Sequence, residues 1–279
     1  MSKGNIFMGQ SRGKLGDVVQ YRAGGQQRQR GYNGTNTSKS YGQQAQRSRL
    51  KSAYNYYKNL KAVVNTGFVA GSAETSPYNR FMAKAMPIAP YLVKQAAEVG
   101  NVIPAPFVLS EGILPFPFSV NAPTYEDPIT FEVGTLPGPT PTVGDLYAAF
   151  IAAAPCLSGK NLKLNAVNIK FTEDTVNGGF KPAYTVVSVP MTSGSTTTLT
   201  AAGLSYSEGD VSVTGTDADS LDAQALFIAE DDGGAITASS YAALGLTSTA
   251  MTAYASSITK DAARAAAESY GVDGGSCTL

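Results

Sequence analysis

Residues 162–171, LKLNAVNIKF, set the fold class of this chain. Alternating apolar side chains at this spacing predict a β-strand with buried residues on one face. The apolar side chains change from even positions (162 and 164) to odd positions (167, 169 and 171). Because successive side chains of a strand point to opposite faces, this change predicts a β-bulge near Asn165 and Ala166.

Similar stretches flank this one. We predict further strands at 129–133, 183–189, 211–214 and 225–229, separated by turns rich in Gly, Asp, Ser and Thr. One helix interrupts them, capped by Thr142 with Asp145 in its first turn, and a second, at about 257–270, closes the chain. Residues 120–279 therefore predict an antiparallel β sandwich, of which a jelly roll is one form, with inserted helices.

The front of the chain predicts a hairpin followed by helices. Residues 12–32, RGKLGDVVQYRAGGQQRQRGY, alternate around a Gly-Gly pair, which is typical of a tight hairpin turn. Residues 43–64 have the spacing of an amphipathic helix, in which one side packs and the neighbouring side is positive. The packing side is Leu50, Ala53, Tyr57, Leu60 and Val64, and the positive side is Arg47, Lys51, Lys58 and Lys61.

One further helix is expected to begin at Ser76-Pro77, and another to run over residues 91–99 and end at Gly100. The Pro-rich, apolar segment 102–120 is more typical of short strands and an extended crossover. We therefore expect an α+β protein in three regions. These are a basic arm, hairpin and helix (1–64), a helical and Pro-rich crossover region (65–119) and a β-rich domain with a C-terminal helix (120–279).

Charge is distributed unevenly along the chain. The first 64 residues hold twelve Lys and Arg and one acidic residue, Asp17, for a net charge of +11; the remaining 215 hold nine basic and twenty acidic residues, for −11. The overall net charge of zero conceals this separation. A basic front joined to an acidic, β-rich body suggests that one end binds a polyanion.

Composition argues against an enzyme. His is absent, which removes the commonest general base and the commonest metal ligand, and no sequence motif of a nucleotide-binding or hydrolytic enzyme occurs. Glu126-Asp127, before Pro128, reads as a turn rather than an acid/base pair. We expect no cofactor and no small-molecule substrate.

Two acidic clusters and two cysteines leave alternatives open. Asp217, Asp219 and Asp222, or residues 230–232, could form a calcium site, but neither cluster follows the twelve-residue calcium loop, and Asp is common in turns. Cys156 and Cys277 do not define a disulfide framework, and we favour two buried or unused thiols over a bridge. No signal-peptide pattern follows Met1 and no stretch is long enough to span a bilayer, so we expect a chain made in the cytoplasm that binds no membrane.

The basic region fits a nucleic-acid surface, because phosphate contacts need only Lys, Arg, amide and hydroxyl donors. Interspersed tyrosines could stack on unpaired bases, although some of them must be core. These tyrosines are Tyr21, Tyr32, Tyr41, Tyr54, Tyr56 and Tyr57. The positive side of the predicted helix could equally be an ordinary solvated face, although no acidic residue between Asp17 and Glu74 can pair with it. The positions that we select for sequence-independent binding are Arg12, Lys14, Arg22, Arg28, Arg30, Arg47, Arg49 and Lys51.

The stretch Ser11–Val19, followed by Gly24-Gly25-Gln26 and Arg28, and then by Gln43–Arg47, resembles a known family. The chain is similar, over about residues 1–115, to uncharacterised proteins of gut Bacteroidetes and of small gut phage and single-stranded DNA virus genomes. The opening residues 1–9 look most like the viral members. The resemblance implies a viral setting and carries no catalytic residues.

In that setting the charge separation suggests a viral structural protein, a capsid or coat subunit that assembles with itself in the virion and contacts packaged nucleic acid through its basic front. Two alternatives remain open. The chain could be a phage appendage or surface-adhesion protein, or a nucleic-acid-binding protein that never enters a particle.

Overall fold

The computed structural model describes residues 13–23, 26–32, 39–69, 76–121, 130–213, 220–232 and 235–272. The chain divides into two compact units, residues 1–39 and residues 40–279. This division differs from the boundaries that we predicted at residues 64 and 119. The helix expected to belong to the basic arm packs instead into the main core of the second unit, through Tyr56, Leu60 and Val64.

The first unit is a small antiparallel sheet, in the order β1 (Gly13–Leu15), β2 (Val18–Ala23) and β3 (Gln26–Gly31). The predicted hairpin is confirmed, and Ala23 pairs with Gln26 across a two-residue loop that lies outside the described residues. Strand β1, which we did not predict, joins β2 through the turn at Gly16, whose φ of 58° suits glycine. No side chain described in this unit is fully buried.

A large antiparallel sheet organises the second unit, in the order β12-β11-β7-β8. Its strands are β7 (Leu162–Glu173), β8 (Phe180–Met191), β11 (Asp222–Asp232) and β12 (Ala235–Ser239), with the short β14 (Gly245–Leu246) also on β11. The predicted bulge at Asn165 and Ala166 is wrong, because β7 pairs residue for residue with β8 and β11 throughout this stretch. The register shift lies between Glu230 and Asp231 instead.

The change of apolar parity has another cause: β7 is buried on both faces. Val167, Ile169 and Phe171 belong to one hydrophobic core, and Leu162 and Leu164 belong to a second. The neighbouring strand β11 repeats the arrangement, with its odd positions 223, 225 and 227 in the first core and its even positions 226 and 228 in the second. The large sheet therefore separates two cores, and its central strands β7 and β11 contribute apolar side chains to both.

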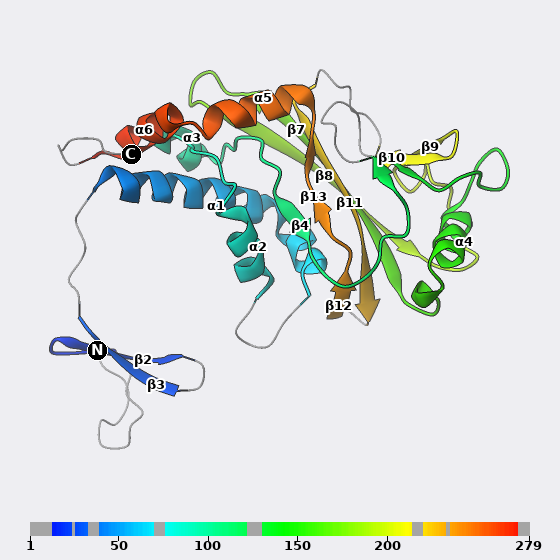
Figure 1. Ribbon diagram of the computed structural model, residues 1–279, viewed down its shortest axis with the longest axis horizontal. Helices are drawn as coiled ribbons and strands as arrows, with labels where there is room; N and C mark the ends of the chain where they lie inside the picture. The colour runs from blue at the N-terminus through cyan, green and yellow to red at the C-terminus, as the bar shows by residue number, and fades with distance from the viewer. Residues whose placement is uncertain are drawn as a thin grey trace. The chain divides into compact units, whose positions relative to one another are not determined.

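Helices cover the first core. They are α1 (Tyr41–Gly67), α2 (Pro77–Ala85) and α5 (Ser248–Ser257), with α3 (Lys94–Val99) and α6 (Lys260–Ser269) beside α1 (Figure 1). The N-caps Ser40 and Ser76 accept from backbone N–H groups, Ser76 as predicted. Helix α3 starts later than expected because the N–H of Leu92 donates to the buried Ser48 hydroxyl. Helix α5 was not predicted.

The second core lies between the large sheet and a smaller sheet of order β5-β6-β10-β9, closed by α4 (Val143–Ala153) (Figure 1). These strands are β5 (Val120–Asn121), β6 (Thr130–Glu132), β9 (Leu204–Ser207) and β10 (Asp210–Val213). Helix α4 has the predicted cap, since Thr142 and Asp145 exchange hydrogen bonds, and a short 3-10 turn (Pro155–Leu157) follows it.

The fold is α+β with antiparallel sheets, as expected. The chain visits the two sheets alternately, two strands at a time: β5-β6 and β9-β10 belong to the smaller sheet, and β7-β8 and β11-β12 belong to the large one. The β sandwich, with the jelly roll as one of its forms, stays a prediction. A last two-stranded pair, β4 (Val108–Ser110) with β13 (Ala242–Ala243), lies beside α1. None of the described helices is long and apolar enough to cross a membrane.

Candidate nucleic-acid interface

One face of the β1-β2-β3 sheet gathers three of the predicted cations. Residues directly opposite each other in an antiparallel pair project from the same face. Lys14 is opposite Val19, which is opposite Arg30, and Arg28 is opposite Tyr21, two residues further along β2. Lys14, Arg28 and Arg30 therefore share a face, which we call the cationic sheet face.

Aromatic rings accompany these cations. The Lys14 ammonium lies 3.5 Å from the centroid of the Tyr32 ring, and the Arg30 guanidinium lies 5.8 Å from that of Tyr21. Such pairs contribute about 0.5–1 kcal/mol each at exposed sites. They also place a flat π surface beside each positive charge, the combination that unpaired bases and phosphates require.

The sheet does not bring all of the predicted positions together. Arg22 is opposite Gln27, one residue out of phase with Tyr21 and Arg28, so it projects from the other face. Arg12 lies outside the described residues. The spacing of two residues along β3 is enough to place Arg28 and Arg30 on one face, but only the register with β1 adds Lys14 to them.

A second row of cations follows α1. Arg47, Lys51, Tyr54, Lys58 and Lys61 are all exposed, and their spacing of four and three residues keeps them on one side of the helix. We call this row the α1 stripe. The predicted positive side of the helix is confirmed as an exposed side, whereas Leu50, predicted to pack, is 48% exposed.

Arg49 has a different role from its neighbours. Its Nε donates to the carbonyl of Ala89 at 3.0 Å, and its Nη2 donates to the carbonyls of Met86 and Pro87 at 2.6 and 2.7 Å. Its guanidinium also lies 5.6 Å from the centroid of the Tyr91 ring. These bonds hold α1 against the segment after α2, so we leave Arg49 out of the proposed surface.

Ion pairs within the chain are frequent among the cations after residue 64 and absent from the cations of the sheet face and the α1 stripe in the described front. Six of the nine Lys and Arg after residue 64 lie 2.8–3.8 Å from a carboxylate oxygen of the same chain. Among the described residues of the front, the cations of the sheet face (Lys14, Arg28, Arg30) and of the α1 stripe (Arg47, Lys51, Lys58, Lys61) have no such pair. The ion pairs recorded among the described residues thus leave these seven charges without a carboxylate partner.

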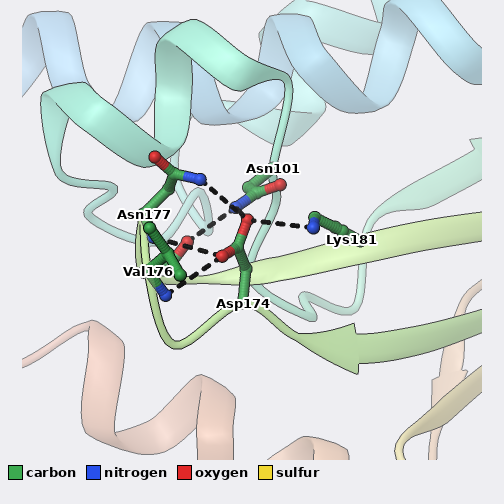
Figure 2. Close-up of polar contacts among 6 residues, drawn as sticks. Asn101, Asp174, Val176, Asn177 and Lys181 are labelled. Carbon is green, nitrogen blue, oxygen red and sulfur yellow. Dashed lines mark hydrogen bonds and ion pairs between the residues drawn. The ribbon is translucent and has the colours of Figure 1, made fainter.

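Asp174, in the turn between β7 and β8, is the most constrained carboxylate described (Figure 2). It accepts from the backbone N–H groups of Val176 and Asn177 at 3.1 Å and from the side-chain amides of Asn101 and Asn177 at 3.0 and 3.1 Å. These hydrogen bonds, that of Asn101 foremost, hold the pKa of Asp174 well below its usual range. With Lys181 at 3.5 Å, the carboxylate is fully occupied in tying the turn to Asn101.

The acidic clusters give no metal centre in the part of the chain that the structure describes. Glu230 and Asp231 pair with Lys160 and Lys163 at 2.8 and 3.6 Å. Within the described ranges no three His, Cys, Asp or Glu side chains gather as a metal site. The predicted positions Glu126, Asp127, Asp217 and Asp219 lie outside these ranges, as does Cys277. Cys156 is free and exposed, so of the two expected states it fits an unused thiol and not a buried one.

In comparisons with known proteins, no family model, no curated protein and no solved structure matches the chain.

Proposed function

We propose that this protein is a viral structural protein, a capsid or coat subunit that assembles with itself and contacts packaged nucleic acid through its basic front. The observation that carries the proposal is the set of seven exposed or solvent-facing cations without a carboxylate partner among the described residues. Unpaired like charges on one face repel each other, and a polyanion removes that repulsion. The resemblance to virus-encoded proteins supplies the viral setting.

The first unit also supports assembly or binding. Every residue of β3 is exposed, and three strands need an apolar face packed on something to be stable in water. A neighbouring subunit on one face would supply this packing, and phosphates on the cationic sheet face would add ionic contacts.

Salt dependence of nucleic-acid binding tests the contact. We compare the wild-type protein with the triple variant Lys14→Gln, Arg28→Gln and Arg30→Gln. Each phosphate contact contributes about 0.9 to the slope of log K against log salt for duplex DNA, so the variant should lose about 2–3 units of slope.

A matched control removes the same charge elsewhere. Arg80, Lys170 and Lys260 belong to the body and have no ion pair among the described residues. Changing these three to Gln should leave the slope within about 0.5 of wild type, because net charge falls equally but no phosphate contact is lost. Equal slopes for both triple variants would refute the assignment of the sheet face.

Assembly needs a separate measurement. Electron microscopy of the concentrated protein, with and without nucleic acid, should show closed shells or regular lattices. Monomers or dimers alone in sedimentation would refute the coat subunit and leave a nucleic-acid-binding protein outside the particle. If deletion of residues 1–40 abolished host attachment but left the genome content of the particles intact, the protein would be a phage appendage or adhesion protein and not a coat subunit.

A further inference from the structure

A cavity of about 410 Å³ lies against the α1 stripe. Arg47, Leu50, Lys51 and Tyr54 of α1 line it, at positions i, i+3, i+4 and i+7 of one helix face. Helices α2 and α3 and the end of α6 complete the wall, so the cavity is built entirely within the second unit. Its volume falls in the range of small-ligand sites.

The wall is aromatic and partly uncovered. Tyr54, Tyr78 and Tyr270 line it together with Leu50, and both Tyr54 (42%) and Leu50 (48%) are unusually exposed for large apolar side chains. The hydroxyl of Tyr270 is buried and has no hydrogen-bond partner among the described residues. A flat ligand would cover the exposed rings of this wall.

Two cations stand at the same cavity. The Arg47 Nη1 donates to Gln44 Oε1 at 3.1 Å, and the Lys51 ammonium lies 5.6 Å from the centroid of the Tyr54 ring. Neither has an ion pair with a described carboxylate. Glu98 is the one acidic residue of the lining, and its recorded ion pair is with Lys94 at 3.8 Å rather than with either α1 cation.

We propose that this cavity accepts an unpaired nucleobase against its tyrosines while Arg47 and Lys51 bind the adjacent phosphate, so that the body of the protein prefers single-stranded over duplex nucleic acid. The inference rests on the proposed function and deepens it by naming the form of the polyanion. Bases of a duplex are stacked on each other and cannot enter a cavity, whereas a single strand can give one base to an aromatic wall. An apolar side chain from another subunit would fill the cavity but would leave both cations without an anion.

Fluorescence anisotropy with a labelled 12-nucleotide single strand tests the proposal. Tyr54→Ala should lower affinity by about 5- to 150-fold, which is the loss of one stacked base, with an unchanged salt slope. Lys51→Gln should reduce the slope by about 0.7, which is the loss of one phosphate contact to a single strand. Tyr241→Ala is the matched control, because Tyr241 is 67% exposed and does not line the cavity.

The two proposals fail in different ways. If the wild-type protein bound neither single strand nor duplex, the proposed function itself would fall. If the wild type bound the single strand and Tyr54→Ala equalled Tyr241→Ala, only the cavity would be excluded, and the cationic sheet face and the rest of the α1 stripe would remain as the binding surface.

A mapping experiment does not depend on variant folding. An oligonucleotide carrying 5-iodouracil, irradiated on the wild-type protein, should cross-link to peptides containing Tyr54, Tyr78 or Tyr270. Cross-links confined to residues 1–40 would overturn the inference.

Discussion

Gly67→Ala should destabilise the second unit, and the same substitution at the other end of α1 should not. A Cβ at Gly67 would lie 2.0 Å from the carbonyl oxygen of Leu109 and 3.1 Å from the Cα of Ser110, so α1 or β4 must move. The carbonyl of Gly67 also accepts from the N–H of Glu111 at 3.0 Å and from the hydroxyl of Ser239.

Three contributions set the magnitude. Forcing a methyl group into a packed contact costs about 1–3 kcal/mol, and each weakened hydrogen bond costs about 0.5–1.5 kcal/mol. The better helix propensity of Ala offsets up to about 1 kcal/mol of this. We expect a net loss of about 3 kcal/mol in the free energy of unfolding, within a range of about 1–5.

Gly42 provides the control within the same helix. It is exposed, and a Cβ there would meet nothing within 4 Å, so Gly42→Ala should be neutral or stabilising by up to about 1 kcal/mol. Urea unfolding followed by circular dichroism at 222 nm should give a lower midpoint for Gly67→Ala and an equal or higher midpoint for Gly42→Ala. Two variants within about 0.5 kcal/mol of each other would refute the close approach of α1 to β4.

Three further predictions concern the body of the protein. The hydrogen bonds that depress the pKa of Asp174 stabilise the fold above the unfolded pKa of about 3.9, and this contribution is lost as the pH falls below that value. Asp174→Asn should therefore lower Tm at pH 7 and flatten the fall in Tm between about pH 5 and 3. Parallel Tm curves for the wild type and the variant would contradict this. Arg49→Met should lower Tm and leave the nucleic-acid affinity unchanged, whereas Arg47→Met should lower the affinity and leave Tm unchanged. A loss of affinity in Arg49→Met would show that Arg49 belongs to the binding surface after all. Phe227→Ala and Ile228→Ala, adjacent on β11, should cost about 3–5 and 2–5 kcal/mol in urea unfolding, and a cost below about 1 kcal/mol for either would show that its face of the sheet is not a core.

Two features of the candidate surface were predictable from the sequence: the separation of charge along the chain and the helical spacing of the α1 cations. The sequence could not supply the sheet face, because Lys14 joins Arg28 and Arg30 only through strand pairing, and β1 is a three-residue strand with no pattern of its own. Nor could it distinguish Arg49 from Arg47, since the carbonyls that occupy Arg49 belong to residues almost forty positions away.

The cavity also depends on distant residues. Tyr54 and Tyr270 are more than two hundred positions apart, and no spacing rule relates them. The sequence had marked Tyr54 as one of several tyrosines able to stack on bases, but Tyr56, in the same group, is fully buried and donates to the carbonyl of Ile103.

The amino-acid sequence by itself determined the features that depend on near neighbours along the chain. These are the caps at Ser76 and Thr142, the strand at 162–171 and the basic front, because capping, side-chain periodicity and local charge involve only residues within a few positions. Only the tertiary structure decided that the large sheet is buried on both faces and that α1 belongs to the body. Burial of a face depends on what the rest of the chain places against it, and those partners come from residues far away in the sequence.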